Sequence, residues 1–175
     1  NVVSPDDLVR DYGCDSLRMY ELFVGPPELD AEWDDRGIDG VNRFLKRLWG
    51  ILMDSKDKDV QPTKEMVKLR HRMVYDITTR LESFSLNTVI SGFMEYNNKF
   101  MEIAKKEGGI DKETLETIAV LLSPFAPHFA EEMWEQLGHE ETIFNAGWPK
   151  YDENEMKDDE IKIPVQINGK TKAVI

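Results

Sequence analysis

The sequence predicts a mainly α-helical protein: an antiparallel helical bundle followed by a C-terminal β-hairpin. Three observations support this prediction. Apolar residues recur at spacings of three and four through most of the 175 residues. Residues that start or stop helices bound each of these stretches. Only residues 161–175 alternate between apolar and polar side chains, as a strand pair does.

The N-terminal segment predicts two short helices. Ser4 and Pro5 form a strong helix start, with two aspartates in the first turn to complement the helix dipole. Gly13 is expected to end this helix. Asp15 is expected to cap a second helix over residues 16–23.

Three long helices are predicted next, roughly over residues 37–53, 63–83 and 86–106, with a charged linker over residues 54–62. Their apolar stripes comprise Ile38, Val41, Phe44, Leu45, Leu48, Trp49 and Leu52 in the first helix, Met66, Leu69, Met73, Ile77 and Leu81 in the second, and Val89, Ile90, Phe93, Met94, Asn97 and Met101 in the third.

Two shorter helices complete the predicted bundle. Asp111 is expected to cap the first of them, and the second spans residues 127–137 after a corner that Pro124 and Pro127 impose. Residues 143–159 are expected to form coil. Asn168-Gly169 is the preferred two-residue hairpin turn between strands over residues 161–167 and 170–175. We interpret this hairpin as the start of a truncated next domain.

Composition and charge exclude several classes of protein. No apolar run is long enough to span a membrane, and the single cysteine excludes a disulfide framework, so a cytoplasmic protein is predicted. The net charge of −12 does not favour nucleic-acid binding. However, residues 1–35, 36–106 and 107–175 carry net charges of −8, +5 and −9. The central positive segment can hold phosphates locally.

Arg43, Lys46 and Arg47 are the candidate phosphate-binding residues, because spacings of three and four place them on one helix face. An ordinary solvated face is the alternative. A second basic cluster contains Lys64, Lys68, Arg70, His71 and Arg72, and the same alternative applies to it. Trp33, in an acidic loop, is interpreted as an anchor to the core, with base stacking as the alternative.

Nothing in the sequence predicts catalysis or a metal site. The three histidines, His71, His128 and His139, lack the spacing of metal ligands, and no glycine-rich phosphate loop is present. His128 is interpreted as a structural hydrogen-bonding residue. Cys14 is interpreted as a small buried residue rather than a nucleophile. The residues alone therefore predict a helical domain with a basic central face, and no named function.

Several segments, in order, resemble the bacterial-type leucyl-tRNA synthetase family. They are Asn1 to Asp6, which resembles the residues after the family's ATP signature loop, Tyr12 to Arg18, Val41-Asn42-Arg43-Phe44-Leu45-Lys46-Arg47-Leu48-Trp49, Pro124-Phe125-Ala126-Pro127-His128 with Glu131-Glu132-Met133-Trp134, Trp148-Pro149, and Val165-Gln166-Ile167-Asn168-Gly169-Lys170. Together they span essentially the whole chain.

The resemblance implies connecting helices over residues 1–35, an anticodon-binding helical bundle over residues 36–150, and the start of a C-terminal domain over residues 151–175. It implies a parent enzyme that joins leucine to its tRNA with ATP and Mg, with its catalytic and editing domains upstream. This chain would hold no catalytic residue and no cofactor. It would position the tRNA for leucine, with Arg43, Lys46 and Arg47 on the tRNA-facing helix.

A function of another class stays open. The chain would then be a structural or protein-interaction bundle with little RNA affinity of its own, as its acidic ends and overall charge favour. A stand-alone enzyme is disfavoured, because no cluster of titratable residues is apparent.

Overall fold

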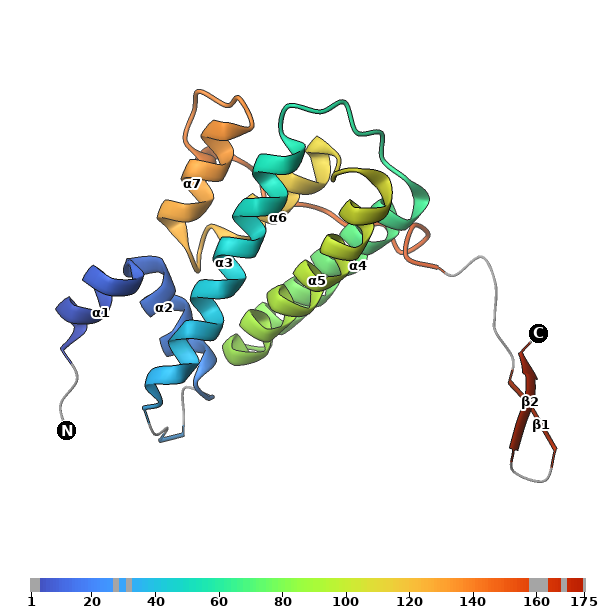
Figure 1. Ribbon diagram of the computed structural model, residues 1–175, viewed down its shortest axis with the longest axis horizontal. Coiled ribbons are helices and arrows are strands. Elements are labelled where there is room, and N and C mark those ends of the chain that lie inside the picture. Colours follow the sequence, from blue (N-terminus) through green and yellow to red (C-terminus); the bar gives the residue numbers. More distant parts are fainter. Residues whose placement is uncertain (1–3, 27–28, 31–32, 158–163, 168–169, 175) are drawn as a thin grey trace.

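The computed structural model describes residues 4–26, 29–30, 33–157, 164–167 and 170–174, and within them it confirms a mainly helical bundle (Figure 1). The helices are α1 (Pro5–Tyr12), α2 (Cys14–Phe23), α3 (Asp35–Ser55), α4 (Lys64–Glu82), α5 (Leu86–Glu107), α6 (Lys112–Leu122), α7 (Pro127–Gln136) and the short 3-10 helix η1 (Ile143–Asn145).

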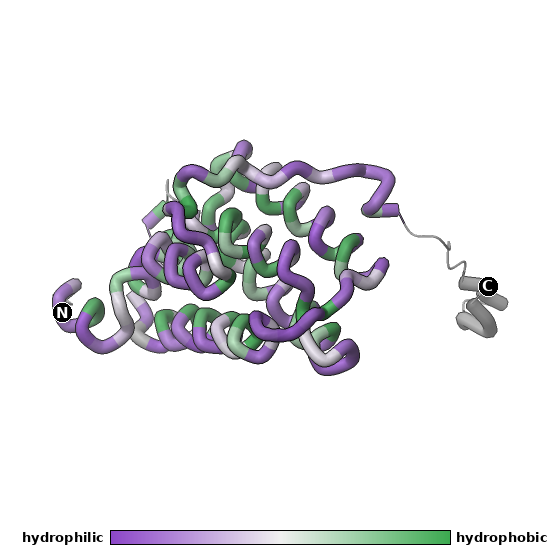
Figure 2. The backbone as a smooth tube through the Cα atoms, turned by 90° about the horizontal axis from the view of Figure 1, so that it is seen from above, coloured by the Kyte–Doolittle hydropathy of each residue, from purple (hydrophilic) through white to green (hydrophobic). Residues whose placement is uncertain are grey.

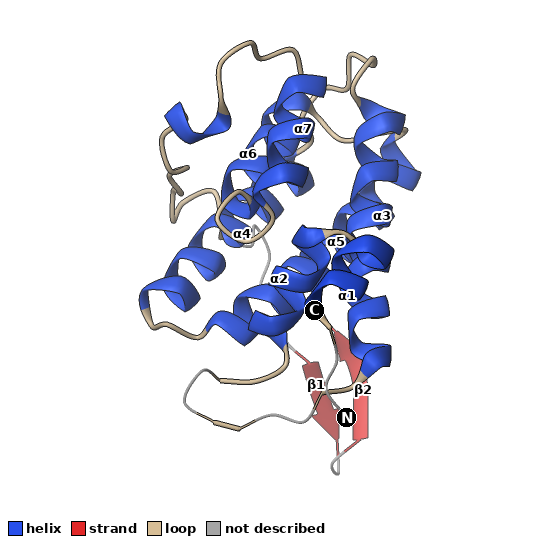
Figure 3. Ribbon diagram, turned by 90° about the vertical axis from the view of Figure 1, so that its left-hand side faces the viewer, coloured by secondary structure: helices blue, strands red, loops and turns tan. Residues whose placement is uncertain are grey.

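Helix α5 lies at the centre of the bundle, where it contacts α2, α3 and α4. Helices α4 and α5 form an antiparallel pair, with α3 packed on the α5 side and α6 on the α4 side (Figure 3). Hydrophobic and hydrophilic residues alternate along each helix of the bundle (Figure 2). The apolar residues meet in one core, because each stripe turns inward. The predicted stripes of the three long helices are all buried or partly buried.

Local capping explains several helix boundaries. Thr63 and Asp111 accept hydrogen bonds from the backbone N–H of Met66 and Thr114, at 3.3 and 3.0 Å. The cap of α6 is therefore the predicted one. Helix α3 is longer than predicted, because Asp34 accepts from the N–H of Arg36 at 3.0 Å and starts the helix two residues earlier.

Helix α1 starts at Pro5 with Ser4 as its N-cap residue, as predicted, although the Ser4 side chain makes no capping hydrogen bond. Two predictions about the second helix are wrong. Asp15 lies inside α2, which begins at Cys14, and Asp15 accepts instead from the N–H of Phe129 at 2.6 Å. Cys14 is exposed rather than buried. Since the partner of Asp15 is more than a hundred residues away, its local position could not reveal this link between α2 and α7.

The predicted coil after α7 runs along α4 in the opposite direction, and we call residues 148–156 the strap. Trp148 Nε1 donates to Thr78 Oγ1 at 3.0 Å, and the Asp152 N–H donates to His71 Nδ1 at 3.0 Å. The strap therefore belongs to the bundle, although among residues 143–157, which the structure describes, only η1 is regular secondary structure.

Two strands, β1 (Pro164–Ile167) and β2 (Lys170–Val174), pair antiparallel, with a register shift between Val165 and Gln166. The expected turn residues Asn168 and Gly169 lie outside the described residues, as do residues 161–163 and 175. The two-residue turn and the full length of the hairpin therefore stay predictions.

Candidate nucleic-acid interface

Three cations form an exposed ridge on α3. Arg43, Lys46 and Arg47 are all exposed, whereas Phe44, between them in sequence, is 5% exposed. The apolar stripe of α3 is buried against the rest of the bundle, and this burial turns the opposite face of the helix to solvent. The three predicted binding residues thus share one solvent-facing surface, which we call the α3 ridge.

No partner within the described part of the chain neutralises the α3 ridge. Arg43, Lys46 and Arg47 form no ion pair with any of the described side chains, while Arg36, a little upstream, pairs with Asp34 at 3.3 Å. Three cations this close repel one another mildly in water. A surface of this kind gains electrostatic free energy when phosphates approach it.

Two glycines of α3 lie beside the ridge and have free space around them. Gly40 and Gly50 lie inside α3, and a Cβ atom added to either would meet no heavy atom of the surrounding protein within 4 Å. Glycine inside a helix costs about 1 kcal/mol relative to alanine. Packing within this molecule therefore gives no reason for glycine at these positions.

Two hollows flank the α3 ridge. Lys46 lines the first, of about 550 Å³, together with Trp49, Phe129 and the exposed Cys14. Its walls come from the α1–α2 junction, α3 and α7, and the rings of Trp49 and Phe129 meet edge to face at 5.7 Å between centroids. The surface that lines this hollow is mainly apolar.

The second hollow, of about 500 Å³, adds cations that the sequence did not single out. Arg47 lines it together with Lys58 and Lys105, and Asp54 is its acidic member. Lys58 Nζ donates to the carbonyl oxygen of Gly108 at 2.7 Å, which offsets the negative end of α5. Lys58 comes from the linker and Lys105 from α5, so no local spacing could have placed them beside Arg47.

The second basic cluster, on α4, is divided by the fold. Arg70 is buried, and its Nη1 lies 3.4 Å from Asp111 Oδ1 and 2.9 Å from Glu113 Oε2. His71 accepts from the strap. Lys68 and Arg72 instead line a hollow between α4 and α5. The cluster is therefore divided among a buried ion pair of Arg70, strap contacts of His71 and Arg72, and a basic wall that Lys68 and Arg72 form.

The remaining predicted polar residues take structural positions. His128 Nδ1 lies 3.0 Å from Asp15 Oδ1, which confirms the interpretation of His128. The Trp33 ring packs edge to face on Tyr20 at 4.9 Å, as the anchor interpretation predicts. Burial and, to a lesser degree, the hydrogen bond to Asp76 raise the pKa of Tyr96 above its ordinary value. That pair joins α4 to α5.

Metal-binding clusters and membrane-spanning helices are both absent from the part of the chain that the structure describes. No group of three histidine, cysteine, aspartate or glutamate side chains there is arranged to hold a metal ion. None of the described helices is both long and apolar enough to cross a membrane.

Comparison with known proteins connects this geometry to a family. The family described as "Anticodon-binding domain of tRNA ligase" matches residues 63–175. A leucine–tRNA ligase of Fervidobacterium nodosum is 47% identical over 191 residues, covering 100% of this chain and 23% of that protein. A leucine–tRNA ligase of Phocaeicola vulgatus is 43% identical and covers 98% of the chain and 18% of that protein.

A solved structure agrees with these relatives. It is the crystal structure of the ternary complex of Agrobacterium radiobacter K84 agnB2 LeuRS with tRNA and LeuAMS, with a TM-score of 0.81 and 26% identity. The match covers 100% of this chain and 24% of that one. This chain thus spans about a quarter or less of the proteins it resembles. The resemblance to leucyl-tRNA synthetases is confirmed, and the chain belongs to the family of anticodon-binding domains of tRNA ligases.

Proposed function

We propose that this chain is the tRNA-positioning, non-catalytic portion of a leucine–tRNA ligase, and that Arg43, Lys46 and Arg47 contact the tRNA backbone. The observation that carries the proposal is the α3 ridge: three exposed cations on one helix face with no acidic partner among the described side chains. The solved relative with tRNA in its complex supports tRNA as the ligand.

The ridge suits phosphates rather than bases. Arginine presents a planar fork that binds two phosphate oxygens at once, and lysine adds a point charge. Such contacts release condensed counterions and set the orientation of the RNA without reading its sequence. The chain would therefore hold the tRNA in register, and recognition of leucine and its tRNA would depend on other parts of the ligase.

The parent activity follows as part of the same proposal. The whole ligase would join leucine to its tRNA with ATP and Mg in the cytoplasm, and the catalytic and editing domains would lie outside this chain. We assign no cofactor and no catalytic residue to the chain itself. Its partners would be the tRNA for leucine and those two domains of the ligase.

We also propose a division into three parts. Residues 1–35 would connect the catalytic core to the bundle, residues 36–150 would form the anticodon-binding bundle, and residues 151–175 would begin the C-terminal domain with a β-hairpin. Contacts of α2 with α3 and α5 support a firm connection at the first boundary. At the second boundary the strap continues along α4 as far as Met156, whose carbonyl oxygen accepts from Arg72 Nε at 3.2 Å.

One observation favours the alternative of a structural bundle with little RNA affinity of its own. The net charge of −12 repels a polyanion at long range. At about 0.15 M salt, however, screening acts over about 8 Å. Local charge therefore decides binding once the RNA is near the ridge.

Binding of tRNA to this chain tests the proposal. We expect micromolar binding at about 50 mM salt, similar for the tRNA for leucine and an unrelated tRNA, and at least about tenfold weaker for Arg43→Glu combined with Arg47→Glu. Lys150→Glu is a control for a single charge reversal away from the ridge, because Lys150 is also an exposed cation but lies on the strap. If the double variant, still folded by circular dichroism, binds as tightly as Lys150→Glu, the α3 ridge is not the interface.

A further inference from the structure

We propose that the hollow between α4 and α5 is a second site for RNA phosphates, on the opposite side of α5 from the hollow that Arg47 lines. This inference rests on the proposed function, because it takes the ligand to be RNA. The hollow has a volume of about 540 Å³. It is lined by Glu65, Lys68, Leu69, Arg72, Lys99, Glu102, Ile103 and Lys106.

The hollow has an excess of positive charge. Four of its lining residues are cations and two are acids, which gives a formal charge of +2 in a molecule whose total is −12. Its two apolar members, Leu69 and Ile103, are partly and fully buried. Low-dielectric walls beneath a group of like charges focus the field outward. The hollow is therefore a local attractor for anions.

The fold builds this charge from two helices. Lys68 and Arg72 are four residues apart on α4, so they lie on one face. Lys99 and Lys106 are two helical turns apart on α5 and face them across the antiparallel pair. Lys106 Nζ lies 3.3 Å from Glu65 Oε2, which shows how closely the two walls approach at this end.

Contacts within the chain hold two of these cations in place and keep a third one charged. Arg72 Nε donates to the Met156 carbonyl oxygen, and Lys99 Nζ lies 5.0 Å from the centroid of the Tyr96 ring. Hydrogen bonds to Glu107 and then Glu65 raise the pKa of Lys106, which keeps it charged. Those two acids are exposed partners of an exposed lysine, and such pairs contribute little, so phosphates can compete for Lys106.

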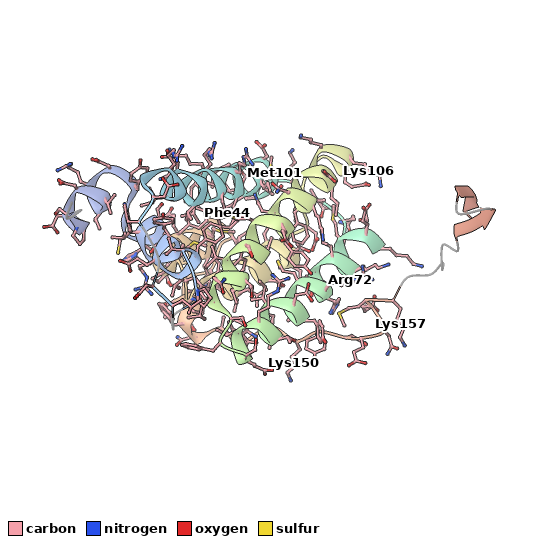
Figure 4. The ribbon with its side chains drawn as sticks, turned by 90° about the horizontal axis from the view of Figure 1, so that it is seen from below. Phe44, Arg72, Met101, Lys106, Lys150 and Lys157 are labelled. Carbon is pink, nitrogen blue, oxygen red and sulfur yellow. The ribbon has the colours of Figure 1, made fainter. Side chains whose placement is uncertain are left out.

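The end of α5 links this hollow to the α3 ridge. Lys105 lines the hollow on the α3 side, and the next residue, Lys106, lines the hollow on the α4 side. Figure 4 shows Lys106 at this end of α5, with Met101 toward α3 and Arg72 on α4. An RNA strand that leaves the ridge and crosses the end of α5 would meet cations on both sides. One bound RNA strand would therefore place phosphates at both the α3 ridge and the α4–α5 hollow.

Charge reversal in the hollow tests this inference. We expect Lys99→Glu with Lys106→Glu to weaken tRNA binding at least about tenfold at about 50 mM salt, and Lys99→Gln with Lys106→Gln to weaken it less. Glu102→Gln removes one of the two acids and should tighten binding. Both lysines are exposed, so the fold should survive, which circular dichroism checks. Lys150→Glu again serves as the control, with little effect expected.

The outcomes separate this inference from the proposed function. If only Arg43→Glu with Arg47→Glu weakens binding, the α4–α5 hollow is no RNA site and the proposed function stands. If only the Lys99 and Lys106 reversal weakens it, the hollow stands and the α3 ridge fails. No tRNA binding by the unmodified chain at low salt overturns both. Tripolyphosphate, titrated alone, tests whether the hollow binds a free polyphosphate instead of RNA. If tripolyphosphate binds while Lys99→Glu with Lys106→Glu leaves tRNA binding unchanged, the assignment of RNA to the hollow is wrong.

Discussion

The α3 and α4 helices each carry a basic cluster that looks alike in sequence, yet the fold uses the two clusters differently. On α3, Arg43, Lys46 and Arg47 stay exposed, without an ion pair among the described side chains. On α4, Arg70 is buried between Asp111 and Glu113, and His71 binds the strap. Long-range acids and backbone groups therefore decide which cations remain available to a ligand.

The difference lies in what packs over each helix. The strap and the start of α6 cover much of α4, whereas the outer face of α3 has no such cover in the described residues. A buried cation costs desolvation free energy, which the acids beside it offset, and removing one partner leaves the other charge uncompensated. Arg70 therefore contributes to stability, and the α3 cations are expected to contribute to binding.

The largest expected effect comes from removing Arg70. Arg70→Ala leaves the Asp111 carboxylate, 4% exposed, without its cationic partner, and should lower the free energy of unfolding by about 3 kcal/mol. Arg43→Ala should change it by less than about 0.5 kcal/mol, because its side chain is exposed. Urea unfolding measures both. Equal losses of unfolding free energy in the two variants would contradict the proposed difference between a structural Arg70 and an exposed Arg43.

A second prediction concerns the α4–α5 contact at high pH. The raised pKa of Tyr96 means that the folded chain keeps this hydroxyl protonated above about pH 10, where a tyrosine in the unfolded chain ionises. Stability should therefore fall as pH rises above that point, by up to about 1.4 kcal/mol per pH unit from this residue.

Tyr96→Phe should remove that part of the alkaline loss, although it also removes the hydrogen bond to Asp76 at neutral pH. Urea unfolding between pH 9 and pH 11 (roughly the range where tyrosine titrates) measures the slope. Tyr75→Phe, on the neighbouring helix α4, is the control, because Tyr75 is 40% exposed. An unchanged slope in Tyr96→Phe would show that Tyr96 does not resist ionisation.

The strap contact should have a smaller effect. His71→Ala removes the acceptor for the Asp152 N–H, and we expect a loss of about 1 kcal/mol in the free energy of unfolding. Hydrogen exchange of the Asp152 amide should quicken in the same variant. If exchange at Asp152 is unaffected, the strap is held by its other contacts, such as that of Trp148 with Thr78.

The smallest effect should be a gain in stability on the ridge. Gly50→Ala adds a methyl group in open space inside α3 and should stabilise the chain by about 0.5 to 1 kcal/mol. Gly109→Ala is the contrasting variant, because its Cβ would lie 2.9 Å from Val60 Cγ2. Thermal unfolding distinguishes them: a loss of stability for Gly50→Ala would mean that the α3 ridge is under a packing constraint the structure does not contain.

Much of the fold follows from local sequence. Periodic apolar stripes and the caps at Thr63 and Asp111 predict the long helices and the start of α6, because both depend on residues within a few turns. The wrong predictions fall where the partner is distant. Asp15 looks like a cap in sequence but binds α7. Likewise, no local pattern predicts that the Glu131 carboxylate accepts from the N–H of Ile143 at 3.2 Å.

The candidate site divides in the same way. Spacing alone predicts the shared exposure of Arg43, Lys46 and Arg47, since it depends on one helix. The hollows beside the ridge need residues from several elements, such as Lys58 and Lys105, and no spacing within one helix can predict them. Sequence therefore identifies the ridge, while the depth and extent of the basic surface require the folded structure.

The most direct test of the central claim is the salt dependence of tRNA binding, measured by titration from about 50 to about 200 mM salt. Each phosphate contact contributes about 0.7 to 0.9 to the slope of log K against log salt concentration. We expect Arg43→Ala, Lys46→Ala and Arg47→Ala together to reduce this slope by about 2 to 3, with the stability of the chain nearly unchanged. A slope equal to that of the unmodified chain would contradict a phosphate-binding role for α3.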